Sequence, residues 1–400
     1  MKKHLIILTA AAMLLLVGCA KSNNGSQADE DYATNAVEVA KQQLGFQVKL
    51  IEDSGRFINP RTVVDGTVQY VPADDWTSGF FPGTMFYMYD LTGDKKWLDY
   101  GVKYTETLDS IKFLKWHHDV GFMIYCSYGN ALRVTNNEAY KDVVIEAAKS
   151  LSTRFRPIAG VIQSWDEDRG WQGKRGWECP VIIDNMMNLE MLFEATKYSG
   201  DSTFHKIAVS HADVTLANHF RPDWSSYHVI DYDKTTDGHV RNKHTAQGYA
   251  HESAWARGQA WAIYGFTVCY RYTKDQRYLD LVDNVYKYVF NHKNLPADMV
   301  PYWDFDAPNI PNEPRDASAA AVIASALYEA AEYGHPEYRE TADKIMKSLS
   351  SPSFLALVGT NGNFALMHST GSIPHGHEID VPLNYADYYY LEALTRKQKK

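Results

Sequence analysis

The stretch T-K-Y-S-G-D-S-T-F, from Thr196 to Phe204, decides the fold because it joins two helix-like segments through a turn of a few residues. Gly200 is of a type that stops a helix, and Phe204 begins the apolar face of the next one. The same order of apolar run, turn and aromatic residue recurs at four other places. These are M-Y-D-L-T-G-D-K-K-W (88–97), R-V-T-N-N-E-A-Y (133–140), Y-R-Y-T-K-D-Q-R-Y (270–278) and A-E-Y-G-H-P-E-Y (331–338).

The aromatic residues after the five turns are separated by 43, 64, 74 and 60 residues. Each interval fits two helices of ordinary length and one longer connection. Five helical hairpins therefore fit between a helix-like run from Asn35 to Leu50 and a last run from Tyr385. The two terminal runs form a sixth pair, so the sequence predicts an all-α fold, an (α/α)6 barrel. An open superhelix of helical repeats is the alternative.

In such a barrel the long connections lie at one end, around the mouth of a central cavity, and the short turns lie at the other. Strand signals are few, and the best is Thr62 to Val71, where Asp65-Gly66 predicts the turn of a short hairpin. We therefore expect the functional residues in the long connections.

The N-terminal residues have the pattern of an export signal. Lys2 and Lys3 precede an apolar stretch from Leu5 to Val17, which is too short to span a bilayer. The stretch ends in L-V-G-C, which resembles the lipobox of bacterial lipoproteins, with Cys19 as the lipidated first residue of the mature chain. A cleaved signal with an incidental Cys is the alternative.

This pattern predicts the domain organisation and the location of the protein. We expect a signal peptide over residues 1–18, the lipidated Cys19 with a flexible tether over 19–34, and a single domain over 35–400. The protein would be an exported bacterial lipoprotein that faces the periplasm or the cell surface. Its only membrane contact would be the lipid anchor.

Charge and cysteine content exclude some classes of partner and site. The formal net charge of −9 argues against a nucleic-acid partner, although local cations can still bind an anionic small substrate. Cys126, Cys179 and Cys269 lie in apolar runs and are odd in number, which predicts buried thiols rather than disulfides or a metal site.

Two aspartates stand in apolar settings at the expected mouth. Asp119 lies in W-H-H-D-V-G-F and Asp184 in W-E-C-P-V-I-I-D-N-M-M-N, each directly before a predicted helix. By spacing alone, both are simplest to explain as helix N-caps, which would favour the charged carboxylate. An apolar setting instead favours a protonated carboxyl group, which suits acid/base chemistry. The two readings predict opposite pKa shifts.

Tryptophan and basic residues gather in the connection that precedes Asp184. Trp165, Trp171 and Trp177 lie there among Arg169, Lys174 and Arg175. Exposed indoles stack well on sugar rings, and guanidinium groups pair with carboxylate or sulfate. A structural use of each Trp as core filler is equally consistent with the sequence.

A second cluster runs through the connection after residue 227. His228 lies in S-Y-H-V-I-D, Gln247 in Q-G-Y, and Arg257 and Trp261 in W-A-R-G-Q-A-W, four residues apart on one helical face. Arg257 among indoles suits a bidentate clamp on a substrate carboxylate, and pairing with an internal Asp or Glu is the alternative. His228 on its own reads as a satisfied core histidine.

Taken together, these motifs resemble the unsaturated glucuronyl hydrolases, glycoside hydrolase family 88. The resemblance runs from about Asp75 to Leu394. It rests on H-D-V-G-F, I-I-D-N-M-M-N, Q-G-Y and W-A-R-G-Q-A-W in that order, with V-P-L-N-Y-A-D-Y-Y near the C-terminus. The family has an (α/α)6 barrel, in agreement with the turn repeat, and it needs no metal or organic cofactor.

The resemblance implies a reaction and the residues that carry it. The family removes the Δ4,5-unsaturated uronate that polysaccharide lyases leave at the non-reducing end of glycosaminoglycan fragments. Asp184 matches the general acid/base and Asp119 the second essential carboxylate. The substrate-binding positions are matched by His228, Gln247, Arg257 and Trp261, and more loosely by Trp76 as a stacking residue.

Two alternatives for the function remain open at this stage. One is an unsaturated rhamnogalacturonyl hydrolase, with the same barrel and chemistry on pectin fragments. The other is a non-catalytic lipoprotein that captures oligosaccharides. Members that prefer 6-sulfated substrates carry S-x-x-S-x-K, whereas the stretch from Ser369 to Pro374 has both serines and no lysine. The resemblance therefore implies no sulfate preference.

Overall fold

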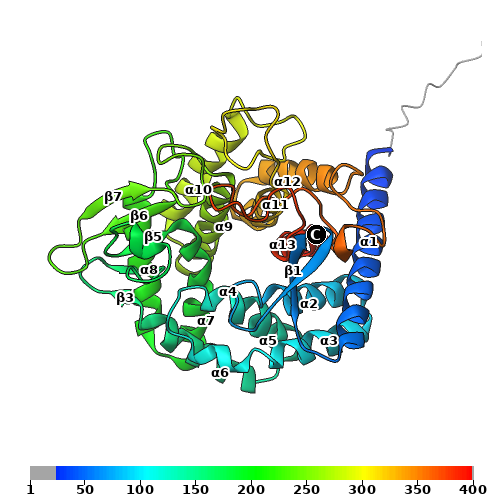
Figure 1. Ribbon diagram of the computed structural model, residues 1–400, viewed down its shortest axis with the longest axis horizontal. Coiled ribbons are helices and arrows are strands. Elements are labelled where there is room, and N and C mark those ends of the chain that lie inside the picture. Colours follow the sequence, from blue (N-terminus) through cyan, green and yellow to red (C-terminus); the bar gives the residue numbers. More distant parts are fainter. Residues whose placement is uncertain (1–23, 399–400) are drawn as a thin grey trace, which may run out of the picture.

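Six helical pairs form a closed ring in the computed structural model, which describes residues 24–398, with side chains from Tyr32 onward (Figure 1). The inner helices are α2 (Phe80–Thr92), the segment α4 (Val120–Ile124), η2 (Tyr125–Gly129) and α5 (Asn130–Thr135), α7 (Leu189–Ser199), α9 (Ala256–Thr273), α11 (Ala317–Ala330) and α13 (Asn384–Gln398). The outer helices are α3 (Lys95–Glu106), α6 (Ala139–Ser152), α8 (Ser202–Asn218), α10 (Gln276–Asn291), α12 (Pro336–Leu349) and α1 (Asn24–Ser54). The chain is an (α/α)6 barrel and not an open superhelix.

The five predicted turns are the C-terminal ends of the first five inner helices. Each ends in a residue with positive φ: Gly93 (69°), Asn136 (54°), Gly200 (74°), Lys274 (57°) and Gly334 (106°). A left-handed residue reverses the chain directly after a helix, which explains the preference for Gly and Asn there. The aromatic residues that follow are all buried: Trp97, Tyr140, Phe204, Tyr278 and Tyr338.

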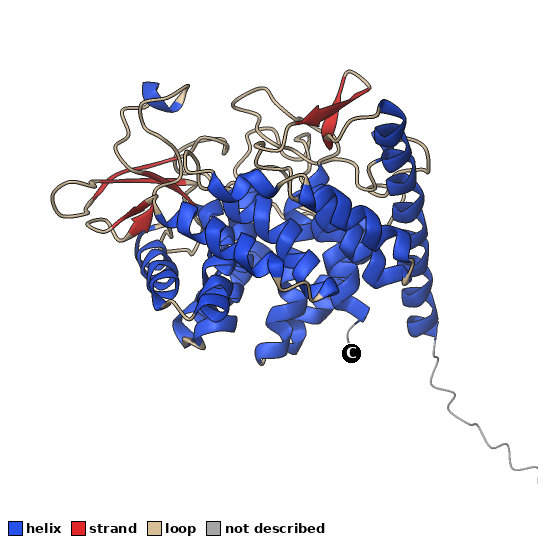
Figure 2. Cartoon of the chain, turned by 90° about the horizontal axis from the view of Figure 1, so that it is seen from below, coloured by secondary structure: helices blue, strands red, loops and turns tan. Residues whose placement is uncertain are grey.

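The last and first helices close the ring, as the sequence predicts. Helix α13 packs between α11 and α2, and α1 contacts α12, α13 and α2. All six inner helices run in the same direction, with their N-termini at the end that carries the long connections (Figure 2). The mouth is therefore built from the connections that precede the inner helices.

Short strands lie in these long connections, and Figure 2 shows them above the helical ring. Strands β1 (Asn59–Val64) and β2 (Thr67–Val71) form the predicted hairpin, with Asp65 and Gly66 both at positive φ in the turn. The other strands are β3 (Phe155–Arg156) with β4 (Val161–Ile162), and an antiparallel sheet of β5 (Pro180–Ile182), β6 (Val229–Tyr232) and β7 (Val240–His244). This sheet delivers Asp184 and His228 to the mouth.

Short 3-10 helices complete the connections. They are η1 (Asp109–Phe113), η3 (Gln172–Lys174), η4 (Ile183–Asn188), η5 (Ala331–Tyr333) and η6 (Asn361–Asn363).

The N-terminal helix corrects the predicted extent of the tether. Helix α1 begins at Asn24, so residues 24–34 are helical rather than a flexible linker. A polar composition does not prevent a helix when the segment runs directly into an amphipathic one, and Ala36 and Ala40 pack α1 onto the barrel. Cys19 and the signal segment lie outside the described residues. Within residues 24–398, no helix is both long enough and apolar enough to cross a membrane.

The three cysteines of the barrel are free and buried, as predicted. Burial raises the pKa of each thiol, so Cys126, Cys179 and Cys269 behave as small apolar residues.

Candidate active site

Asp184 is a buried carboxyl group without a hydrogen-bond partner on Oδ2. It follows β5 in the single turn η4, and its side chain caps no helix. Its pKa is raised to about 7, chiefly by burial; the positive charge of Arg257 opposes this shift and the negative charge of the nearby Asp119 adds to it. The capping reading is therefore wrong for Asp184. Near neutral pH this carboxyl group can both give and take a proton.

His228 presents an N–H group to this carboxyl group. Its Nδ1 accepts hydrogen bonds from the backbone N–H of Ala246 (3.0 Å) and of Gln247 (3.1 Å). Burial lowers the pKa of His228 well below its usual value, so the ring is neutral and its proton is on Nε2. That nitrogen lies 3.7 Å from Asp184 Oδ2 and has no other partner. His228 is therefore more than a satisfied core histidine.

Asp119 is the charged member of the pair. Its carboxylate oxygens lie 3.3 Å from His117 Nδ1 and 3.3 Å from His118 Nε2, and its side chain caps no helix. Burial opposes the charge, but the two imidazoles and the more distant Arg154 outweigh it and lower the pKa of Asp119. The reading that an apolar setting favours a protonated group therefore applies to Asp184 and not to Asp119, because two histidines precede Asp119.

The two aspartate-bearing segments are locked to each other. Asn188 accepts a hydrogen bond from the backbone N–H of Phe122 through Oδ1 (3.1 Å). A Cβ on Gly121 would lie 2.4 Å from that same oxygen, so only glycine fits there. Asn188 also lies 3.5 Å from His118 Nδ1 and donates to Asn185 Oδ1 (3.2 Å). Asn188 was not a predicted site residue, although it is the last residue of the motif I-I-D-N-M-M-N, and Gly121 lies in the motif H-D-V-G-F.

The guanidinium group of Arg257 is bonded within the protein. Its Nη1 donates to Asp316 (2.8 Å) and to the carbonyl of Thr370 (2.6 Å), and its Nη2 donates to the carbonyl of Gly371 (2.7 Å). The alternative, pairing with an internal carboxylate, is therefore correct. The sequence could not identify the partner, because Asp316 is 59 residues away. The fully buried guanidinium still places a positive charge near Asp184.

Trp76 and Trp261 belong to an aromatic layer across the barrel. Both rings pack on Phe122, with centroids 5.6 and 5.4 Å away, and Trp261 also packs on Tyr389 at 5.7 Å. Trp261 is fully buried, and its indole N–H has no partner at normal hydrogen-bond geometry. This N–H group lies close enough to Asp184 to favour the charged carboxylate. Trp76 is half-buried.

The three tryptophans before Asp184 pack on one another rather than standing free. Trp165 stacks on Trp177 (centroids 5.9 Å apart) and meets Trp171 edge to face (5.0 Å). Trp177 is buried, so the core-filler alternative holds for it, whereas Trp165 and Trp171 remain half-buried. Trp165 also lies 6.1 Å from the His228 ring. This cluster forms one wall of the site.

Basic and amide groups lie along the same side of the mouth. Arg175 lies over the rings of Trp171 and Trp177, at 5.5 and 5.4 Å, and Lys174 is exposed beside it. Gln247 reaches the carbonyl of Gly371 at 3.4 Å and so links the second cluster to the C-terminal loop.

One group in the described residues has the spacing of metal ligands, namely Asp233, Asp237 and His239 in the loop between β6 and β7. Asp233 already accepts hydrogen bonds from the backbone N–H groups of Thr235 (2.8 Å) and Thr236 (3.0 Å). These bonds shape the loop and account for the cluster.

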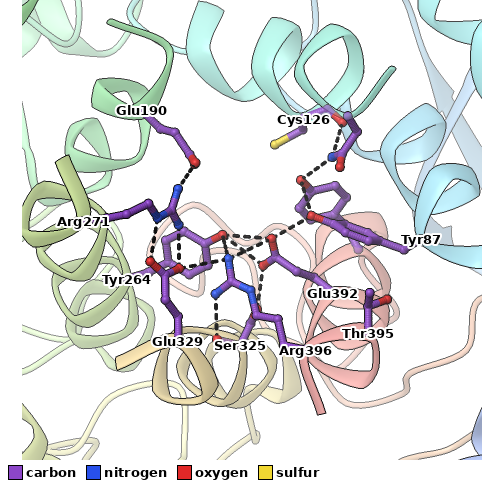
Figure 3. A network of polar contacts seen from close by, with 12 residues as sticks. Tyr87, Cys126, Glu190, Tyr264, Arg271, Ser325, Glu329, Glu392, Thr395 and Arg396 are labelled. Atoms are coloured by element: carbon purple, nitrogen blue, oxygen red, sulfur yellow. Dashed lines mark hydrogen bonds and ion pairs between the residues drawn. The ribbon is translucent and has the colours of Figure 1, made fainter. Parts of the chain in front are cut away.

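A polar cavity of about 660 Å³ is lined by residues near the C-terminal ends of α9, α11 and α13, which places it at the end of the barrel opposite the mouth. Figure 3 shows the network of polar contacts there. Its carboxylates are paired: Glu329 accepts two hydrogen bonds from Arg271, and Arg271 also bonds Glu190. Glu392 accepts from Tyr264 (3.0 Å) and lies 3.3 Å from Arg396. Phe122 and Tyr389 line this cavity, so the aromatic layer separates it from Asp184. The paired groups make this end a structural network.

Comparisons with known proteins agree with the geometry of the mouth. The model of the family Glycosyl Hydrolase Family 88 matches residues 55–400. An unsaturated glucuronyl hydrolase of Formosa agariphila is 43% identical over 395 residues, which cover 98% of this chain and 97% of that protein. An unsaturated chondroitin disaccharide hydrolase of Streptococcus agalactiae is 32% identical over 387 residues, or 91% of each. The crystal structure of an unsaturated glucuronyl hydrolase specific for heparin superposes with a TM-score of 0.87 at 46% identity, covering 92% of this chain and 97% of that one.

Proposed function

The chain belongs to glycosyl hydrolase family 88, and from that premise we propose that Asp184 is the proton donor and Asp119 its charged partner. The enzyme removes the Δ4,5-unsaturated uronic acid from the non-reducing end of lyase-generated glycosaminoglycan oligosaccharides by hydration of the vinyl ether. One observation carries the assignment: a buried carboxyl group with no partner on Oδ2 has a pKa of about 7 beside a carboxylate that stays charged.

The reaction begins with transfer of the Asp184 proton to ring carbon C4. The electron pair of the C4–C5 double bond forms the new C–H bond and leaves an oxocarbenium-like cation at C5 and the ring oxygen. Asp184, now a carboxylate, accepts a proton from the water that attacks C5. The hemiketal collapses, the ring opens and the aglycone sugar leaves. This differs from ordinary glycoside hydrolysis, in which the acid protonates the leaving oxygen.

Asp119 has two effects in this scheme. Its negative charge raises the pKa of Asp184 and so keeps the donor protonated near neutral pH. The same charge stabilises the cationic transition state in a site shielded from water. His228 supports the second half of the cycle, because its Nε2–H faces the carboxylate that forms at Asp184.

The remaining predicted residues frame the uronate. Trp76 and Trp261 belong to the aromatic layer beside the reacting carbon, and Gln247 offers an amide next to the loop from Ser369 to Pro374. Arg257 acts through its charge and by holding that loop. These contacts support recognition of an acidic sugar.

A panel of lyase-generated disaccharides from chondroitin, heparin and rhamnogalacturonan tests the substrate class. The unsaturated uronate absorbs in the near ultraviolet, and hydration destroys this absorbance. We expect loss of absorbance with at least one glycosaminoglycan disaccharide. Turnover of the pectin fragment alone would transfer the assignment to the rhamnogalacturonyl hydrolases.

We also propose that Cys19 carries a lipid anchor that holds the enzyme on a membrane facing the periplasm or the cell surface. The support is the sequence L-V-G-C after an apolar stretch. Expression of the full chain in a bacterial host fed with labelled fatty acid should label the protein, and Cys19→Ala should remove the label. Equal labelling of both proteins would contradict the anchor.

A further inference from the structure

A positively charged groove lies beside the active site, on the outer side of the segment that follows β4. It is a shallow, open groove of about 670 Å³ between η1 and the residues around Asp166. Its lining includes four cations, Lys115, Arg154, Arg156 and Arg169, and a single carboxylate, Asp166. In a chain with a formal net charge of −9, such a local excess of positive charge calls for a ligand of opposite sign.

Two large aromatic side chains stand exposed in the same groove. Phe113 is 58% exposed and Trp116 is 50% exposed, in a chain that buries most of its aromatic residues. Exposed indoles beside cations are suited to sugars that carry carboxylate or sulfate groups.

The groove is joined to the reacting carboxyl groups by direct contacts. The Trp116 ring meets the His117 ring edge to face at 4.3 Å, and His117 lies 3.3 Å from the Asp119 carboxylate. Arg154 is near enough to contribute to the lowered pKa of Asp119. On the other side, Asp166 directly follows Trp165, which belongs to the wall of the active site. The groove and the active site thus share one wall.

The cations differ in how far they are already engaged. Arg154 is buried, pairs with Asp166 (3.1 Å) and donates to the carbonyl of Lys115 (3.0 Å), so it holds the groove together. Arg169 is exposed and lies 3.5 Å from Asp166 and 4.0 Å from the exposed Asp168, in contacts open to solvent that a stronger anion can replace. Lys115 is exposed and has no ion-pair partner among the described residues. Lys115 and Arg169 are therefore available to a ligand.

We propose that this groove binds the anionic continuation of the substrate beyond the sugar that is released, with Trp116 as the stacking platform and Lys115 and Arg169 as contacts for carboxylate or sulfate. The inference rests on the proposed function. It makes the enzyme selective for chain length: a tetrasaccharide reaches the groove, whereas a disaccharide does not fill it.

The test compares an unsaturated tetrasaccharide with the disaccharide from the same lyase digest, for wild type, Trp116→Ala and the double variant Lys115→Gln/Arg169→Gln. The expected result is a tenfold or larger fall in the ratio of kcat/KM for tetrasaccharide to that for disaccharide. Added salt should lower kcat/KM for the tetrasaccharide in the wild type more steeply than in the double variant. Trp116→Phe should restore part of the ratio, because it keeps an aromatic face.

A matched control removes two positive charges elsewhere. Lys95 and Lys344 are exposed on outer helices, and Lys95→Gln/Lys344→Gln should leave the ratio unchanged. An unchanged ratio in the groove variants, or an equal loss on both substrates, would overturn the proposal. Wild type that turns over neither substrate would instead contradict the proposed function itself.

Discussion

The two ends of the barrel treat buried carboxyl groups in opposite ways. At the mouth, Asp184 has no partner on Oδ2, and burial raises its pKa to about 7. At the closed end, which is the end of the barrel opposite the mouth, Glu329 accepts two hydrogen bonds from Arg271 and lies 3.3 Å from Arg396. These guanidinium groups lower its pKa to about 2. Both carboxyl groups are about 9% exposed, so burial alone does not decide the state of a carboxyl group.

The difference shows what each end is built for. Glu329 at the end opposite the mouth is paired with two guanidinium groups, which keep it charged at neutral pH, and it ties together helices that are distant in sequence. Asp184 at the mouth lacks such a cation within bonding distance and therefore changes its charge near neutral pH.

The largest expected effect comes from Asp184→Asn. The amide keeps the shape but cannot transfer a proton, so kcat should fall about 1000-fold or more. Folding should not suffer. The raised pKa of Asp184 stabilises the folded protein fully only below the pKa of Asp in the unfolded chain, and this stabilisation is lost as pH rises through about 7. Asn carries no charge to bury, so above pH 8 the free energy of unfolding of the variant should exceed that of the wild type by up to about 4 kcal/mol.

Loss of uronate absorbance and urea unfolding measure these two effects. Retained activity with a large loss of stability would support helix capping instead.

Asp119→Asn should lower kcat by about 100-fold, since a charge that stabilises the cationic transition state is removed. It should also move the alkaline limb of the pH–rate profile. In the wild type, kcat/KM falls as pH rises through about 7, because Asp184 loses its proton. Without the negative charge of Asp119, the pKa of Asp184 drops and the limb shifts to lower pH. A limb that stays in place would show that the two groups are not coupled.

Arg271→Met at the closed end should lower stability by about 2–3 kcal/mol and leave the reaction intact. It leaves Glu190 and Glu329 without their shared cation, and breaking a buried pair costs several kcal/mol, less here because Arg271 is 27% exposed. Urea unfolding and kcat/KM on a disaccharide measure the two quantities. A fall in kcat/KM with unchanged stability would show that the two ends are coupled through the aromatic layer.

Glu329→Gln removes one acid-sensitive contribution to stability. The lowered pKa of Glu329 stabilises the wild type above the unfolded value of about 4.5, and this stabilisation is lost as pH falls through about 2. Stability of the variant should therefore change less with pH between about 4.5 and 2. Acid unfolding followed by circular dichroism measures it, and an identical acid transition in both proteins would contradict the assignment.

The fold could be predicted because its signals are local. Each hairpin turn contains a residue that stops a helix and an aromatic residue that starts the next face, and both lie within nine residues of each other. The helical start of α1 at Asn24 was missed because its packing partners lie in α12, α13 and α2, far along the chain.

The site was only partly predictable for the same reason. Asp184, Asp119 and His228 come together as expected, but the pKa of Asp119 depends on His117 and His118. The partners of Arg257 are Asp316 and the carbonyls of Thr370 and Gly371, which no spacing rule connects to it. The sequence identifies which residue types are present, whereas their charge states depend on contacts between segments that are distant in the sequence.

The shared direction of the inner helices has a consequence for the electric field of the protein. Six helix N-termini converge on the mouth, and each carries the positive end of a helix macrodipole. Each of these ends favours a negatively charged group. The backbone of the barrel thus favours an anionic ligand at the mouth, in addition to what the side chains contribute.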